Sequence, residues 1–184
     1  MWSRWITRYA SVALAVAMLV ALPAIADSAK LAAGEVFPSI EADSIAGTHV
    51  ALPSEHRAAP FVTIFSLSQK AGEASARWSH ALFKALPPAV AIYAVADLSR
   101  VPGLFRGFAI SGIRHEASPA QPEHRDHVLL LTHGNVWSQI VPDGSDDDAV
   151  IVAVDQTGRV TDIERRAFSD AAAIDVANTI TNRP

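Results

Sequence analysis

The spacing of apolar and polar residues in the first half of the chain predicts alternating strands and helices. Residues 61–67 are almost continuously β-branched or aromatic, which is typical of a strand buried on both faces. Apolar residues within 72–86 recur at the interval of one helix face, and Pro87-Pro88 ends that helix. The run 90–96 is again almost wholly apolar and predicts a second buried strand. This succession indicates an α/β domain in which helices cover a central sheet.

The pattern continues with weaker periodicity through the middle of the chain. A second helix is predicted over 101–111, with Gly112 at its end. The polar stretch 114–126 is typical of a loop, and 128–131 is a third short apolar run. The chain therefore supplies a third candidate strand for the same sheet.

Two hairpins and a terminal helix complete the predicted elements. Residues 39–53 contain a central Ala-Gly turn, which suggests a small N-terminal hairpin. Strands are predicted over 149–154 and 159–163, joined by an Asp-Gln-Thr-Gly turn. Residues 170–181 place their apolar side chains on one helix face, and Ser169 is a suitable N-cap.

The first 26 residues have the pattern of a secretory signal peptide. Two arginines are their only charges, 10–22 is an uncharged apolar run, and Ala24-Ile25-Ala26 has the small-x-small form that signal peptidase cleaves. As a helix this run would rise only about 20 Å, short of a hydrocarbon core of roughly 30 Å. We therefore expect a cleaved signal peptide over 1–26 and an exported domain, periplasmic or secreted, over 27–184. The alternative is an anchor retained in the membrane.

Composition and charge narrow the classes of partner. The chain of 184 residues is 50% hydrophobic and 18% charged, as in one globular domain, and its formal net charge is −4. Removal of the first 26 residues leaves 13 basic and 19 acidic side chains, a net charge of −6. This balance argues against binding DNA, RNA or anionic lipid through overall charge. We expect no nucleic-acid partner, and membrane association only if the N-terminal run is retained.

The chain contains no cysteine. Dithiol exchange, peroxidatic attack and thiolate metal ligation all need a cysteine sulfur, so these activities are excluded. An exported domain without disulfides must also be held together by core packing alone. We expect no catalytic residues and no cofactor.

Several segments together resemble the thioredoxin-like superfamily. They are the run 61–67 before a helix that bears Trp78, and the strand, Asp, turn Gly, strand arrangement of 150–160. Gly34 to Pro38 and the hairpin region 46–53 are similar to the leader of exported TlpA-type redoxins. Among the branches, the cysteine-poor redoxin-like assembly factors of the mitochondrial ATP synthase are the most similar. The resemblance implies a thioredoxin-like three-layer sandwich, with a central mixed sheet flanked by helices and an N-terminal β-hairpin extension.

The departures from that family concern its reactive residues. Its catalytic members carry cysteine where the first helix begins, and the corresponding stretch here, Ser66 to Glu73, has none. The family's cis-proline before the hairpin strand is replaced by Asp148-Ala149. The resemblance therefore implies a redox-inactive binding, assembly or chaperone module for an envelope or membrane-complex protein. The binding groove is predicted from the surface where relatives hold extended peptides, and its residues here are Ser66, Ser68, Lys70, Asp148 and Ala149, with Arg106 at its border.

A cluster of histidines supports an alternative, a copper- or zinc-handling protein. His115, His124, His127 and His133 lie within about twenty residues, and imidazole is a common ligand of both metals. Their spacing matches no standard zinc pattern, so a solvated polar loop is the competing interpretation.

Other candidate motifs favour structural roles. The acidic run 143–148 lacks the glutamate of a calcium-binding EF-hand loop and predicts a solvated turn. Serine, histidine and aspartate occur without the Gly-x-Ser-x-Gly elbow of many hydrolases. Trp78 has the helical spacing of a core residue, whereas Trp137 fits either core packing or a binding surface.

Overall fold

The computed structural model describes residues 31–56, 59–117, 122–133, 140 and 147–181. In chain order the elements are β1 (Ile40–Ser44), β2 (His49–Leu52), the 3₁₀-helix η1 (Ser54–His56), β3 (Phe61–Ser66), α1 (Gln69–Ala85), β4 (Ala91–Asp97), α2 (Gly103–Glu116), the 3₁₀-helix η2 (Pro122–His127), β5 (Val128–Leu131), β6 (Val150–Val154), β7 (Val160–Glu164) and α4 (Asp170–Thr181). Both hairpins and the terminal helix lie where the sequence predicts them.

The described strands form one mixed sheet in the order β2-β1-β5-β4-β3-β6-β7. Strand β4 runs parallel to β3 and to β5, whereas β6 runs antiparallel to β3. Parallel neighbours need a crossover connection, which α1 supplies between β3 and β4 and α2 supplies between β4 and β5. The predicted α/β architecture with a central mixed sheet is confirmed.

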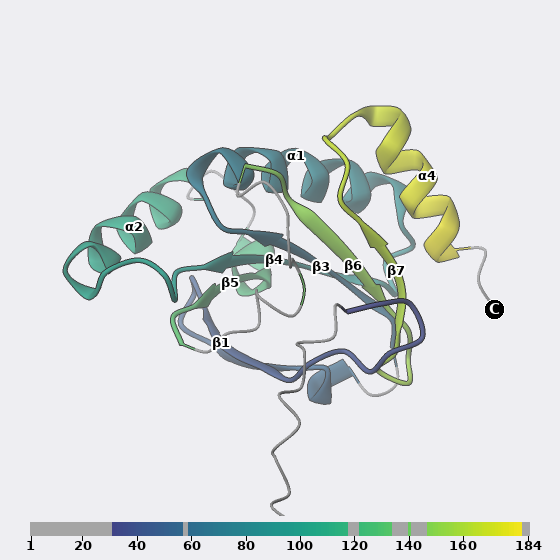
Figure 1. The fold of residues 1–184 in the computed structure, drawn as a ribbon, viewed down its shortest axis with the longest axis horizontal. Helices are drawn as coiled ribbons and strands as arrows, with labels where there is room; N and C mark the ends of the chain where they lie inside the picture. Colours follow the sequence, from purple (N-terminus) through teal and green to yellow (C-terminus); the bar gives the residue numbers. More distant parts are fainter. Residues whose placement is uncertain (1–30, 57–58, 118–121, 134–139, 141–146, 182–184) are drawn as a thin grey trace, which may run out of the picture.

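The sheet separates two hydrophobic layers. Figure 1 shows the helices above the sheet and β1 of the N-terminal hairpin below it. All three described α-helices lie on one face, where alternate residues of β3, such as Val62 and Ile64, pack against α1 and α4. The intervening Phe61 and Phe65 face the other side and meet the inward positions Ile40 and Leu52 of the N-terminal hairpin. The hairpin strands β1 and β2 thus form the edge of the sheet and bend back beneath its centre. They cover the face opposite the helices and provide the third layer of the sandwich.

Trp78 is the central side chain of the helical layer. It is fully buried, and its ring meets that of Phe168 edge-on, with the centroids 5.4 Å apart. The cluster around it includes Leu82 of α1 and Ile151 of β6. The predicted core role of Trp78 is confirmed.

The helix α1 begins three residues earlier than the sequence predicts. Its first residue is Gln69 rather than Gly72, because the Ser68 side chain caps it and accepts a hydrogen bond from the Ala71 backbone N–H at 3.1 Å. Ala71 is itself fully buried, which fixes the added turn against the sheet.

The predicted loop over 114–126 is largely helical. The helix α2 continues through Gly112 to Glu116, because Ile113 packs with Ile110 against the cluster formed by Ile45, Leu98 and Leu130. Residues 122–127 then form η2. Gly112 therefore does not end the helix, and His115, His124 and His127 lie on helical segments instead of one open loop.

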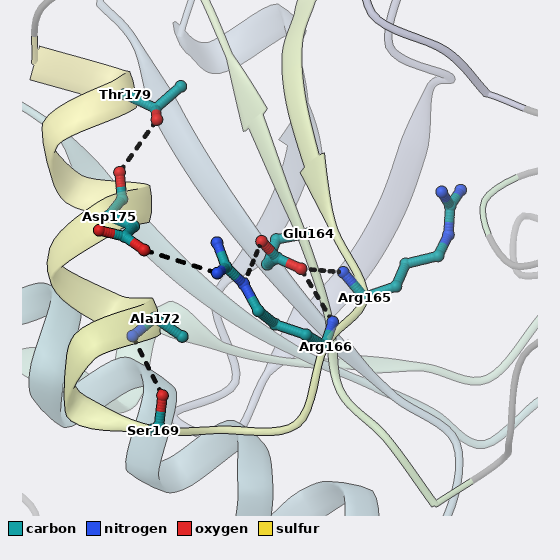
Figure 2. A network of polar contacts seen from close by, with 7 residues as sticks. All are labelled: Glu164, Arg165, Arg166, Ser169, Ala172, Asp175 and Thr179. Atoms are coloured by element: carbon teal, nitrogen blue, oxygen red, sulfur yellow. Dashed lines mark hydrogen bonds and ion pairs between the residues drawn. The ribbon is translucent and has the colours of Figure 1, made fainter.

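Polar contacts fix α4 to the strand before it (Figure 2). Ser169 accepts a hydrogen bond from the Ala172 backbone N–H at 3.1 Å, which confirms the predicted N-cap. The Arg166 guanidinium lies between the Glu164 carboxylate of β7, at 2.6 Å, and the Asp175 carboxylate of α4, at 3.5 Å. The orientation of α4 over the sheet is thus set by charge as well as by its apolar face.

Some sequence predictions lie outside the described residues. These are the signal peptide over 1–26, Trp137 and the first part of the acidic run, 143–146. Among the residues that are described, no helix has both the length and the apolar character needed to cross a membrane.

Candidate functional site

The predicted groove lies where β3 ends, α1 begins and β6 starts. Ser66 is the last residue of β3 and is buried, with its hydroxyl 3.5 Å from the Val95 carbonyl oxygen. Ser68 is half-buried and is the N-cap of α1. The two serines therefore hold the strand and helix ends in place, and only Ser68 reaches the surface.

Charge at this edge comes from Lys70 and the segment before β6. Lys70 Nζ lies 3.0 Å from Asp147 Oδ2, and the two side chains are 71% and 51% exposed. The carboxylate that meets Lys70 is thus Asp147, the neighbour of the predicted Asp148, which is half-buried. Ala149 is buried, so only its backbone is placed to take part in binding. Both side chains are largely exposed to solvent, and an exposed ion pair contributes little to stability.

This arrangement lacks the parts of a nucleophilic site. A serine hydroxyl becomes a nucleophile when an adjacent base accepts its proton. Among the described residues, no hydrogen bond joins Ser66 or Ser68 to a histidine or a carboxylate. The amides that open α1 and the Lys70 ammonium can bind an acidic or carbonyl group, and that is the chemistry present at this edge.

Two further polar groups lie near the same end of the sheet. Asp97 ends β4 and is buried, with Oδ1 accepting from the Ser99 backbone N–H at 2.8 Å, while Oδ2 has no hydrogen-bond partner among the described residues. The Arg106 guanidinium donates to the Val101 carbonyl oxygen at 3.2 Å. Arg106 is therefore turned toward the start of its own helix, and its placement at the groove border stays a prediction.

The histidines of the metal-handling alternative are held apart by separate contacts. His124 packs edge-on against Phe83, with ring centroids 4.4 Å apart, and His133 Nδ1 lies 2.9 Å from the Thr132 hydroxyl. His127 Nδ1 lies 3.0 Å from the Ile92 carbonyl oxygen, and His115 is exposed on α2. Within the described residues, no three histidine, aspartate or glutamate side chains are grouped to hold a metal ion. The structure therefore does not assemble the four histidines into a site.

A cluster of ionisable rings that the sequence analysis did not identify lies beside the hairpin layer. His56 Nε2 is hydrogen-bonded to the Tyr93 hydroxyl, and the His127 ring stacks on Tyr93 with centroids 4.9 Å apart. Burial raises the pKa of Tyr93 to about 12, with a further contribution from the Glu55 carboxylate. Burial also lowers the pKa of His56, and the neighbouring His127 acts in the same direction, although the Glu55 carboxylate opposes them. His56 is consequently neutral at pH 7.

This cluster predicts a loss of stability in mild acid. Because the pKa of folded His56 lies below its ordinary 6.5, the unfolded chain takes up a proton first as the pH falls, and the stabilising contribution of neutral His56 is lost below about pH 6.5. We expect urea unfolding at pH 7.5 and pH 5.0 to show a smaller difference in His56→Gln than in the parent chain. The other histidines are common to both proteins. If the loss of unfolding free energy between pH 7.5 and pH 5.0 were equal in the two, the lowered pKa of His56 would not be the cause of the acid sensitivity.

The hairpin of β6 and β7 has the strand, Asp, turn Gly, strand arrangement predicted for 150–160. This arrangement is one of the features in which the sequence resembles the thioredoxin-like superfamily. Asp155 Oδ1 accepts hydrogen bonds from the backbone N–H and hydroxyl of Thr157, at 2.7 and 2.6 Å, and from the Arg159 backbone N–H at 3.0 Å. Burial by itself would raise the pKa of Asp155, but these hydrogen bonds and the Arg159 charge hold it below its ordinary value. Gly158 has a φ of +80°, which favours glycine. A shallow depression at this turn, distant from the groove, is lined by Pro53, Ser54, Gln156, Thr157 and Gly158.

Solved structures of similar fold are thiol-disulfide proteins. A putative thiol:disulfide interchange protein DsbE from Chlorobium tepidum superimposes with a TM-score of 0.60 at 15% identity, covering 83% of this chain and 97% of that one. The thioredoxin domain of a Bacteroides vulgatus thiol-disulfide oxidoreductase gives 0.56 at 17% identity, covering 83% and 100%. A secreted Mycobacterium tuberculosis disulfide oxidoreductase gives 0.51 at 13% identity, covering 77% and 94%.

Sequence comparison alone identifies no relative, because neither a family model nor a curated protein matches the chain. At the identities given above, structural similarity shows the fold and not the activity. The comparisons therefore confirm the predicted thioredoxin-like fold in a chain that has no cysteine.

Proposed function

We propose that this thioredoxin-like chain is an exported, redox-inactive protein that binds envelope proteins and assists their assembly. The observation that carries the proposal is a groove edge that keeps a capped helix start and exposed charges, although both the cysteines and the cis-proline of the family are absent. Ser68 caps α1 where the thiol proteins of this fold present cysteine, and the Lys70–Asp147 pair leaves two exposed charges beside it. The N-terminal signal pattern and the secreted Mycobacterium tuberculosis structure support export.

Binding at this edge follows from its backbone and its charge. The first amides of a helix carry partial positive charge, and Lys70 adds a full one, so the α1 side of the groove favours acidic or carbonyl groups. Asp147 and Asp148 supply the opposite sign on the β6 side. An extended polypeptide laid between the two sides can match both, and no covalent step is needed to hold it.

Crosslinking from position 70 tests this function directly. We expect a photoreactive amino acid in place of Lys70 to crosslink a defined envelope protein in cells, identified by mass spectrometry. Ala76 is the matched control, because it is exposed on the same helix but lies well beyond the first turn. Equal crosslinking from positions 70 and 76, or none from either, would contradict the proposed groove.

Charge reversal separates partner recognition from the internal ion pair. We expect Lys70→Glu to weaken capture of the crosslinked partner about tenfold, the size of one charge-assisted hydrogen bond at an interface. The double variant Lys70→Glu, Asp147→Lys restores an ion pair with inverted polarity. If this double variant recovered full binding, the pair would serve only to fix the loop, and direct recognition by Lys70 would be wrong.

A further inference from the structure

The 3₁₀-helix η1 is attached to the rest of the domain at both of its ends. At its start, the Ser54 hydroxyl donates to the Ala51 carbonyl oxygen at 3.0 Å, and the Glu55 carboxylate accepts from the Ala51 backbone N–H at 2.9 Å. These contacts join η1 to β2. At its end, His56 crosses to the sheet, where its Nε2 is hydrogen-bonded to the Tyr93 hydroxyl of β4. The link from η1 to the centre of the sheet therefore passes through His56.

His56 lies against aromatic side chains of the hydrophobic core. The centroid of its ring is 5.3 Å from that of Tyr93 and 5.5 Å from that of Phe61. Tyr93 is 6% exposed and Phe61 is 1% exposed, and both belong to the hydrophobic cluster that includes the N-terminal hairpin. The end of η1 therefore covers part of this cluster, and movement of His56 would uncover it.

The hydrogen bond between His56 and Tyr93 has a defined direction. Tyr93 keeps its phenolic proton at neutral and acid pH, because burial raises its pKa to about 12. Among the described residues, the Tyr93 hydroxyl has no other acceptor, so its O–H donates to the lone pair on His56 Nε2. A proton on Nε2 would remove that lone pair. The buried Tyr93 O–H would then have no acceptor, which is unfavourable for a buried polar group.

Two charged groups among the described residues act on His56. The Glu55 carboxylate on η1 favours a proton on its ring, whereas His127 at the end of η2 opposes one. The His127 ring stacks on Tyr93 with the centroids 4.9 Å apart, and its Nδ1–H donates to the Ile92 carbonyl oxygen at 3.0 Å. His127 can therefore take up a proton without losing this hydrogen bond. In acid, two imidazolium ions would repel each other beside one phenol ring.

We propose that η1 is an acid-sensitive latch: a proton on His56 ends its hydrogen bond with Tyr93, the end of η1 leaves the sheet, and the aromatic surface of Phe61 and Tyr93 becomes accessible. The start of η1 stays on β2, because its contacts with Ala51 do not involve His56. The latch uses no residue of the predicted groove, so this inference is independent of the proposed function.

Hydrogen–deuterium exchange followed by mass spectrometry tests the latch. The backbone N–H groups of His56 and Ala59 donate to the carbonyl oxygens of Pro53 and His56, at 2.9 and 3.1 Å, so a peptide over 53–60 reports on η1. After correction for the intrinsic pH dependence of exchange, we expect this peptide to be less protected at pH 5.0 than at pH 7.5. The change should be several-fold and at most about thirtyfold, the limit for an ordinary histidine pKa of about 6.5. A peptide over 170–181 should keep its protection, which distinguishes opening of the latch from global unfolding.

Three variants assign the effect to the pair. His56→Gln keeps an amide oxygen that can accept from Tyr93 but takes up no proton, so its η1 should be equally protected at both pH values. Tyr93→Phe removes the donor, so η1 should already be less protected at pH 7.5 and should respond less to acid. His49→Gln is the matched control, because His49 is exposed on neighbouring β2 beside Asp43 and should leave the response unchanged.

The latch is overturned by any of three results. One is equal protection of 53–60 at the two pH values in the parent chain. Another is an unchanged acid response in His56→Gln, which would show that a different group takes up the proton. The third is an equal loss of protection in 53–60 and in 170–181, because acid would then unfold the whole domain and not release η1.

Discussion

Replacement of Trp78 by alanine is expected to cost about 3–5 kcal/mol of unfolding free energy, as for other large buried aromatic side chains. Trp78 is fully buried between α1, the sheet and Phe168, so its loss leaves a cavity that the surrounding side chains cannot fill. The chain has no disulfide that could offset this loss by stabilising the folded state. For a domain of this size, the melting temperature should fall by roughly 6–20 °C. Urea denaturation followed by circular dichroism measures the difference.

Two further variants show whether the effect is due to packing. Trp78 Nε1 has no hydrogen-bond partner among the described residues, so Trp78→Phe loses volume without losing a hydrogen bond and should cost less than half as much. Phe108→Ala removes a side chain that is 84% exposed and should change stability by no more than about 0.5 kcal/mol. A cost below about 1 kcal/mol for Trp78→Ala would mean that α1 is not packed on the sheet as described.

This packing also positions the residues of the predicted groove. Trp78 lies on the same helix as Ser68 and Lys70, two to three turns further along, and α1 is the element that brings these residues to the end of the sheet. The folded sandwich needs no sulfur to achieve this, because a serine hydroxyl caps α1 as an N-cap should. The fold is therefore formed without the cysteines on which its redox chemistry depends.

The elements that the sequence predicts best are those specified by local pattern. The run 61–67 is a buried strand whatever its neighbours are, and 170–181 has both an apolar face and a capping serine. The end of α2 is extended instead by the tertiary contacts of Ile113 with its cluster, and the first turn of α1 combines the local Ser68 cap with burial of Ala71 in the core. Periodicity within a short window does not contain those contacts.

The candidate site was predicted less completely because its contacts join distant residues. Lys70 and Asp147 are 77 positions apart, and no local pattern distinguishes Asp147 from Asp148 as the partner. His56 and Tyr93 are 37 positions apart, and each is an isolated polar residue in its own segment. Tyr93 did carry a signal, since it bears the only polar side-chain group in the apolar run 90–96 and a buried hydroxyl usually has a partner.

The absence of cysteine allows a direct test of what the groove retains. In Ser68→Cys, the new thiol is the only one in the chain, so every measured thiol property belongs to that position. A thiolate there would take the place of the hydroxyl oxygen that accepts the Ala71 N–H, next to the opening amides of α1 and two residues from the Lys70 ammonium. These neighbours stabilise negative charge, so the thiol pKa should fall from about 8.5 to about 7.5 or lower.

The reaction of this thiol with iodoacetamide as a function of pH measures that pKa. At pH 7, alkylation should be roughly fivefold to tenfold faster than in Ala76→Cys, where the thiol is exposed in the third turn of the same helix and should keep an ordinary pKa. A pKa in Ser68→Cys equal to or above that of Ala76→Cys would show that the electrostatics of a redox site have been lost together with the sulfur. A lowered pKa would mean that the start of α1 still stabilises negative charge, which is the property that the proposed groove uses to hold acidic or carbonyl groups of a partner.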